Sequence, residues 1–202
     1  GTGVDMASEA IGTVVLKCSE LCAHFAEAER LLQEEDRRSN FQTAVYAELL
    51  SYQAHMLMDG SAGERSLDQA YQLIRKACRV TNLNGGAVHC PRRWYESAFF
   101  QLFYPEEWAH LNQSGSQEDA AQMLERASAE GCVDAMALLA ELCFTGAYGY
   151  EHLKNTARGV QLLEAGAARE DAYEQERARC ELRLAQHYMQ TQSGASADVC
   201  YE

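Results

Sequence analysis

The sequence contains few of the residues that build β-sheets, and it contains almost no proline. Valine, isoleucine and threonine together number 18 of 202 residues, and there are only two prolines. Because β-branched residues favour strands, this composition excludes most all-β architectures. The best apolar run, residues 11–16, is far shorter than the roughly 18 residues of a transmembrane helix. We therefore expect a helical chain with no membrane insertion.

Basic residues are also scarce. The chain has 17 lysines and arginines against 30 aspartates and glutamates, which gives a formal net charge of −13. Binding to nucleic-acid phosphates or to anionic lipid needs clustered basic side chains, so neither is an expected partner. A negative charge of this size can steer the chain towards a basic protein partner. It can equally serve only to keep the chain soluble.

Motifs for catalysis or metal binding are absent. The chain has no Gly-x-Ser-x-Gly and no His-Glu-x2-His, and Gly85-Gly86 is not followed by the Lys-Ser or Lys-Thr of a phosphate loop. The eight cysteines have no zinc-site spacing. His89 and Cys90 form the one pair that suggests a cysteine-dependent hydrolase, but adjacent side chains rarely face the same substrate. We expect no catalytic residue, no metal and no cofactor.

Helical periodicity is what the sequence does contain. Apolar residues recur every three or four positions over residues 14–32, which predicts an amphipathic helix. Two further helices are predicted over residues 41–58 and 66–80. At the start of the second of these, Ser66 and Gln69 have the spacing of a capping box.

A pattern of small residues recurs along these helices. The later helix of each expected pair carries it as Ala70-x2-Leu73-x2-Lys76-Ala77, Ala120-x2-Met123-x2-Arg126-Ala127 and Gly159-x2-Leu162-x2-Ala165-Gly166. The earlier helix carries Ala135-x3-Leu139-Ala140-x2-Cys143-x2-Gly146, with weaker copies at Ala54-x2-Leu57-x2-Gly60 and Leu184-Ala185-x2-Tyr188. Small residues allow two helices of a hairpin to approach closely, and a terminal glycine suits a helix C-cap.

This pattern resembles the Sel-one-like repeat, a relative of the tetratricopeptide repeat. Residues 132–170 match one complete repeat, and residues 44–191, about three-quarters of the chain, can be read as divergent repeats. The chain departs from the usual pattern at Ala140, Cys143 and Leu162, where glycine, tyrosine and tryptophan are typical. The resemblance implies an all-α fold, a right-handed solenoid of antiparallel helical hairpins over residues 41–191. Residues 1–40 would then form a helix packed on this array, and residues 192–202 a C-terminal tail.

Repeat solenoids commonly bind proteins, and aromatic and arginine side chains are the usual anchors. The candidate partner-binding residues are Tyr52, Arg92, Arg93, Trp94, Tyr95, Trp108, Tyr148 and Tyr150. We expect residues 92–95 in an irregular insertion after Pro91, and residues 148–150 in the turn between the two helices of the best repeat. Each aromatic could instead belong to the core.

Proteins similar to this family include adaptors, envelope scaffolds and bacterial immunity proteins that neutralise toxic lipases delivered by type VI secretion. The resemblance therefore implies a protein-binding scaffold, with immunity against a secreted, more basic lipase or phospholipase toxin as the leading interpretation. The alternatives are a general adaptor or envelope-assembly scaffold and, from a different class, a cysteine-dependent hydrolase. The oligomeric state stays open.

A lipid-attacking toxin of this kind acts in the periplasm, so we expect this chain there, with the cytoplasm as the alternative. In an oxidising compartment some cysteines should pair. Cys78–Cys90, across the loop between two helices, is the first expected disulfide, and Cys180–Cys200, which would hold the tail, is the second. Cys132 and Cys143 should not pair with each other, because eleven residues of one helix separate them by about 16 Å.

Overall fold

The structure, a computed structural model, describes residues 40–61, 63–81, 88–112 and 118–199. The regular elements in these ranges are helices, which confirms the all-α prediction there. In order they are α2 (Asn40–Asp59), α3 (Leu67–Arg79), α4 (Arg92–Phe103), α5 (Pro105–Leu111), α6 (Ala120–Ala129), α7 (Val133–Thr145), the 3-10 turn η1 (Glu151–Leu153), α8 (Thr156–Ala167) and α9 (Glu174–Val199). The helix expected over residues 14–32 lies outside the described residues.

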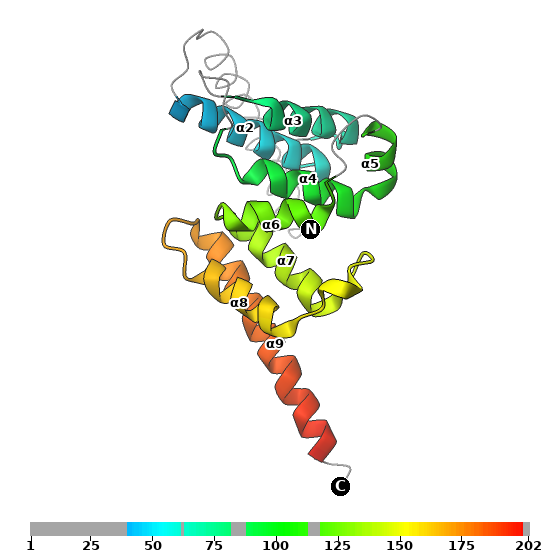
Figure 1. Cartoon of the computed structure of the whole chain (residues 1–202), viewed down its shortest axis with the longest axis vertical. Helices are drawn as coiled ribbons and strands as arrows, with labels where there is room; N and C mark the ends of the chain where they lie inside the picture. The colour runs from blue at the N-terminus through cyan, green and yellow to red at the C-terminus, as the bar shows by residue number, and fades with distance from the viewer. Residues whose placement is uncertain (1–39, 62, 82–87, 113–117, 200–202) are drawn as a thin grey trace, which may run out of the picture. The chain divides into compact units, whose positions relative to one another are not determined.

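The chain divides into two compact units, residues 1–117 and residues 118–202. In the first unit α2 and α3 form a helical hairpin, α4 packs against both, and α5 follows α4 (Figure 1). Ala54 and Ala70 are fully buried in the hairpin, where their small side chains bring α2 and α3 close together. Tyr71 and Phe100 fill the same core with rings 5.7 Å apart.

The start of α3 differs from the sequence prediction in one detail. Ser66 precedes the helix as expected, but its side chain makes no capping hydrogen bond. The backbone N–H of Ser66 donates to the carbonyl of Leu57, at 3.1 Å, so the group that Gln69 would accept from is already bonded. A complete capping box forms instead at the start of α6, between Asp119 and Gln122.

The second unit is built around α7, which contacts α6, α8 and α9 (Figure 1). Ala140 is fully buried in a cluster with Leu163 of α8 and Cys180 of α9. Two glycines of α8 lie at its closest contacts. A Cβ at Gly159 would come within 2.5 Å of the Phe144 ring, and one at Gly166 within 2.8 Å of the Cys180 sulfur. Ala140, Gly159 and Gly166 of the repeat pattern therefore lie at helix crossings, as the pattern predicted, whereas Ala165 and Ala185 of the same pattern are exposed.

The ends of α7 and α9 also bear on the sequence predictions. Gly146 caps α7 in the left-handed conformation, at φ +66°, which agrees with the terminal glycine of the repeat. α9 is 26 residues long and reaches Val199, so the backbone of residues 192–199, expected as a tail, continues this helix. Its C-terminal half extends beyond α7 and α8 in Figure 1.

Candidate functional site

Residues 92–95 do not form an exposed loop. They make the first turn of α4, directly after Pro91, whose φ of −63° suits a helix start. Arg92, Arg93 and Tyr95 are only 7%, 3% and 7% exposed, and Trp94 is half-buried. The prediction of an irregular, exposed insertion is therefore wrong. The prediction failed because a sequence with adjacent aromatic and charged residues is the same whether they lie in a binding loop or in a core with paired charges.

Two buried charged residues of α4, Arg92 and Glu96, are paired with each other and with residues of α2. Glu96 is fully buried, and its carboxylate lies 3.1 Å from Nη1 of Arg92 and 2.9 Å from Nδ1 of His55. Arg92 also lies 3.5 Å from Glu48 and stacks over the ring of Tyr52, with its guanidinium carbon 4.0 Å from the ring centroid. The hydrogen bond to Glu96 raises the pKa of His55 above its usual value. This network ties α4 to α2, because a buried charge is tolerated only with such partners.

Cys90 has the properties of a structural thiol. It is fully buried and its thiol donates to Oε2 of Glu48, at 3.3 Å. Burial, reinforced by the charge of Glu48, raises the pKa of Cys90 to about 12. His89 beside it is exposed. A cysteine nucleophile of a hydrolase needs a lowered thiol pKa and a histidine partner. The raised pKa of Cys90 is the opposite of this requirement.

The structure does not pair Cys78 with Cys90, contrary to our expectation. The Cys78 sulfur lies 3.6 Å from the hydroxyl of Ser97 on α4, whereas the Cys90 thiol is bonded to α2. Cys180 is buried under α8, and its expected partner Cys200 lies outside the described residues.

Cys132 and Cys143 lie at opposite ends of α7, as expected for cysteines that do not pair.

Trp108 belongs to the core of the first unit. It packs edge-on against Tyr71, with ring centroids 5.8 Å apart, and lies 6.3 Å from Phe100. Its indole is half-buried. Of the alternatives left open by the sequence, core packing describes Trp108 best.

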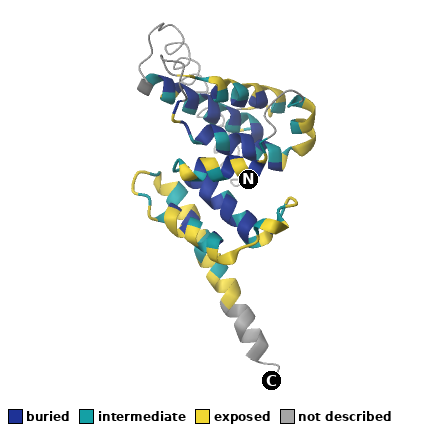
Figure 2. Ribbon diagram, viewed as in Figure 1, coloured by how far each residue is buried: buried dark blue, intermediate teal, exposed yellow. Residues whose placement is uncertain are grey.

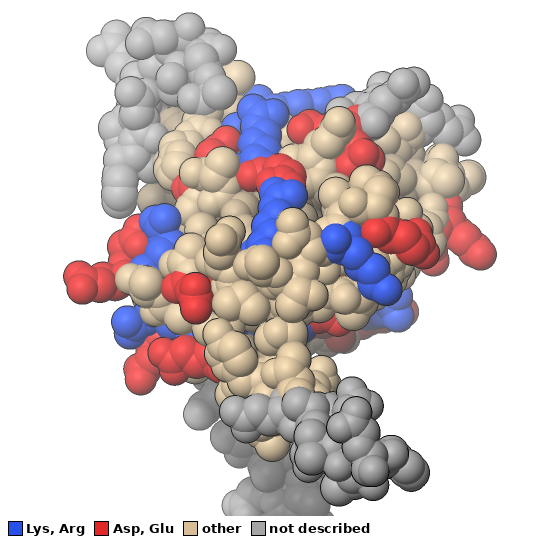
Figure 3. Space-filling view, turned by 60° about the horizontal axis from the view of Figure 1, so that its bottom comes forward, with Lys and Arg blue, Asp and Glu red and all other residues tan. Residues whose placement is uncertain are grey.

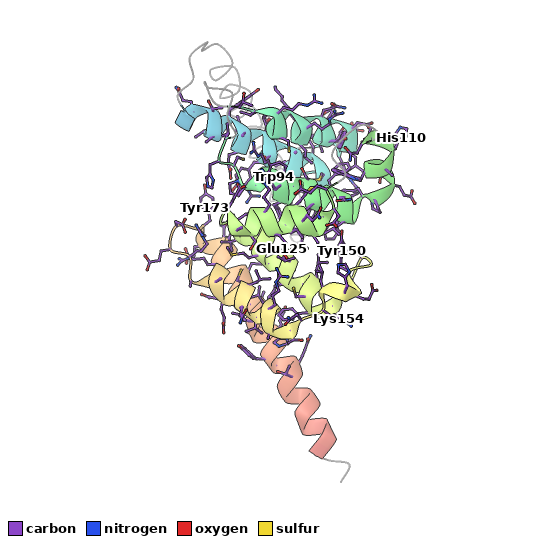
Figure 4. All side chains as sticks on the ribbon, viewed as in Figure 1. Trp94, His110, Glu125, Tyr150, Lys154 and Tyr173 are labelled. Carbon is purple, nitrogen blue, oxygen red and sulfur yellow. The ribbon has the colours of Figure 1, made fainter. Side chains whose placement is uncertain are left out.

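The turn between α7 and α8 keeps one exposed aromatic side chain. Tyr148 is 51% exposed, and at φ +58° it is the one non-glycine residue in the described ranges with a positive φ. Tyr150 is half-buried beside the backbone of Ala121 and Ala120 at the start of α6, and burial raises its pKa (Figure 4). Tyr150 therefore holds the turn in place, and the turn leaves the side chain of Tyr148 exposed.

A groove of about 570 Å³ lies between α7 and α9. Its lining includes Phe144, whose ring stacks on His187 with centroids 4.6 Å apart and an interplanar angle of 7°. Two ion pairs, Arg183 with Glu141 and Arg179 with Asp134, hold α9 against α7 at this groove. Basic and acidic side chains likewise lie next to each other on the face drawn in Figure 3.

The exposed surface of α9 carries an apolar stripe that the sequence analysis missed. The part of α9 that extends beyond α8 is coloured as exposed in Figure 2. Leu182 is 59% and Met189 70% exposed, and Ala178 and Ala185 are also exposed. These four residues, which we call the α9 stripe, lie at positions i, i+4, i+7 and i+11. That spacing was readable in the sequence as one face of a helix, but it did not show that this face would be uncovered.

Comparison of the chain with protein-family models, with curated proteins and with solved structures gives no match. Within the described part of the chain, no group of three or more histidine, cysteine, aspartate or glutamate residues is placed to hold a metal ion. The helices of the same ranges are also too short or too polar to cross a membrane. The exposed Tyr148, the groove and the α9 stripe are three surface features of the described residues that a partner molecule can contact.

Proposed function

We propose that this chain is a non-catalytic, protein-binding scaffold of helical hairpins, wound as a right-handed solenoid of Sel-one-like repeats. Within that class we propose an immunity protein of the periplasm, which binds and blocks a secreted, more basic lipase-type toxin of a type VI secretion system. The observation that supports the binding function is that Tyr148 is exposed and has a backbone φ in the left-handed region.

A tyrosine in the left-handed region is costly. Residues other than glycine, asparagine and aspartate rarely adopt this conformation, and such strain costs on the order of 1–3 kcal/mol. Gly146 and Gly149, which flank Tyr148, also have positive φ and suit the turn. A large aromatic side chain kept at a strained and exposed position favours a role in recognition, because strained residues cluster at ligand-binding sites.

The turn that carries Tyr148 is fixed at both ends. The N–H of Gly146 donates to Leu142 at 2.8 Å, and the N–H of Asn155 donates to Cys143 at 2.9 Å. Tyr150 adds the contact to α6 described above. An aromatic residue on a preorganised turn loses little conformational entropy on binding, which is why tyrosine is common at interface hot spots.

Charge supports a basic partner. A net charge of −13 accelerates association with a positively charged protein, and this effect weakens as salt rises. The choice of a lipase toxin rests on the resemblance to the repeat family. The raised pKa of Cys90 is one reason to prefer a binding protein to a cysteine-dependent hydrolase.

The test begins with affinity capture from the native bacterium and identification of the captured protein. A secreted lipase with a net positive charge would support immunity, provided that co-expression of this chain protects cells from it. Capture of an envelope component, or no protection, would overturn the immunity proposal.

Dissociation of the captured complex then tests the site. Tyr148→Asn removes the ring and suits the left-handed backbone, so the turn should fold. We expect dissociation to be about 30-fold faster, the equivalent of a hot spot of about 2 kcal/mol. Tyr173→Asn is the matched control, because Tyr173 is 68% exposed and precedes α9, where asparagine is a favoured N-cap. Equal rates for the two variants would place the binding site elsewhere.

A further inference from the structure

The α9 stripe has the spacing of a coiled-coil seam. Ala178, Leu182, Ala185 and Met189 are separated by four, three and four residues, which are the alternating steps of a heptad repeat. All four side chains are exposed. In the first hairpin, by contrast, the small side chains of Ala54 and Ala70 are fully buried against a neighbouring helix. The α9 stripe therefore has the spacing of a helix-packing surface, but no helix of the described residues covers it.

Large and small residues of the stripe are arranged with internal symmetry. If a second α9 runs antiparallel, about a two-fold axis between Arg183 and Leu184, Ala178 faces Met189 of the second copy. In the same register Leu182 faces Ala185 of the second copy. Each large side chain thus meets a small one in all four layers, which is the condition for close packing without voids or overlap. A two-fold pair requires such a self-complementary surface.

The polar flanks of the stripe tolerate the same register. A two-fold axis brings each flank against its own counterpart in reverse direction. In this register Glu181 faces Gln186 of the second copy, with Tyr188 two residues further on. Arg179 faces Tyr188 of the second copy, with Gln186 two residues away. No like charges are directly opposed. α9 as a whole has three arginines against four acidic residues, so it is close to neutral in a chain of net charge −13.

We propose that the α9 stripe is a dimerisation surface, occupied by the α9 stripe of a second copy of this chain in an antiparallel pair. The contact is narrow, so the dimer is weak and forms reversibly at micromolar or higher concentration. The two copies repel each other through their net charge, and the seam itself is apolar. Dimerisation therefore strengthens as salt rises, whereas binding of a basic toxin weakens. This opposite response separates the dimer from the proposed function.

Sedimentation equilibrium of the full chain tests the proposal, across a concentration series at low and at high salt. We expect the mass to rise from 22.5 kDa towards twice that value as the concentration rises, and to come closer to it at high salt. Met189→Glu should restore the monomer, since two glutamates would enter the seam. Val45→Glu is the matched control, because Val45 is an exposed apolar residue of α2, 42% exposed, and this variant should still dimerise.

A size exchange provides the sharper test. Ala178→Met alone sets methionine against methionine and should weaken the dimer at least tenfold. The double variant Ala178→Met with Met189→Ala restores one large and one small residue in each layer, and should dimerise like the original chain. A chain that stays monomeric at all concentrations, as it would if residues 1–39 covered the stripe, overturns the proposal. So does a dimer that is indifferent to these changes. Tyr148→Asn should leave the dimer intact.

Discussion

Replacing Gly159 with alanine tests whether α8 is held as closely against α7 as the structure shows. In an isolated helix this change is stabilising by up to about 1 kcal/mol, because glycine has the greater conformational freedom to lose. In the folded chain the new Cβ would lie 2.5 Å from Cε1 of Phe144, and 2.8 and 2.9 Å from two further ring atoms. Ordinary carbon contacts are about 3.5–4.0 Å, so the ring must move by about 1 Å.

The free-energy cost of moving the Phe144 ring can be estimated within limits. The ring is stacked on His187, and overpacking of a core costs typically about 1–3 kcal/mol. Subtracting the gain in helix propensity leaves a net loss of about 0–2 kcal/mol in the free energy of unfolding. The substitution is therefore expected to be neutral or destabilising in the folded chain, whereas it is stabilising in a free helix. Urea unfolding of the full chain, followed by far-ultraviolet circular dichroism, measures it.

Two controls make the Gly159 result specific. Gln161 is exposed on the same helix, so the pair Gln161→Gly and Gln161→Ala measures the propensity difference without a clash. In a Phe144→Leu background the ring atoms are gone, and Gly159→Ala should there become neutral or stabilising. The coupling between positions 144 and 159 should reach about 1 kcal/mol or more. If Gly159→Ala stabilises the original chain by the full propensity difference, the close approach of α7 and α8 is refuted.

Four further predictions concern other parts of the chain. The pKa of His55 is raised chiefly by its hydrogen bond to Glu96, so the stabilisation from this contact is complete below about pH 6.5 and is lost as the pH rises through the raised value. The free energy of unfolding of the original chain should accordingly fall relative to that of His55→Gln as the pH rises above about 6.5; parallel curves would contradict this. Cys90, with a pKa of about 12, should be alkylated at neutral pH far more slowly in the folded than in the unfolded chain, as peptide mass spectrometry would show. Ala140→Leu should lower the stability by about 1–3 kcal/mol, because Ala140 has no exposed surface, and a neutral result in urea unfolding would mean that this crossing is looser than described. Asp119→Ala should cost about 0.5–2 kcal/mol in the same assay by removing the capping box of α6, and an unchanged unfolding midpoint would show that the box contributes nothing.

Local features of the fold were predictable from the sequence. The helices over residues 41–58 and 66–80 agree with α2 and α3 to within a residue or two at each end. The turn after Gly146 is where the repeat pattern placed it. These features depend on periodicity, on glycine geometry and on the absence of strand-forming residues, which act within a few residues of the chain. The capping box predicted at Ser66 does not form, because the N–H of Ser66 donates to the carbonyl of Leu57. A complete capping box is found at Asp119 instead.

The candidate site was much less predictable. Arg92, Trp94 and Tyr95 have the composition of a binding loop, yet Arg92 and Tyr95 are buried. Burial of Arg92 is possible because Glu96 and Glu48 compensate its charge. Nothing local distinguishes a paired arginine from a displayed one. Tyr148 and Tyr150 differ in the same way, since Tyr150 is half-buried beside the start of α6 whereas Tyr148 is 51% exposed.

The sequence by itself determined that the described chain is helical, where α2 and α3 lie, and that small residues such as Ala54, Ala70 and Ala140 are buried between helices. It did so because those properties follow from the conformational preferences of each residue and from a period of 3.6. The tertiary structure decided which charges are paired, which thiols are buried and which apolar faces remain open. Those outcomes depend on contacts between residues some 40 positions apart, such as His55 with Glu96 and Asp134 with Arg179. The α9 stripe illustrates both parts: its heptad spacing is written in the sequence, but its exposure results from where α7 and α8 pack.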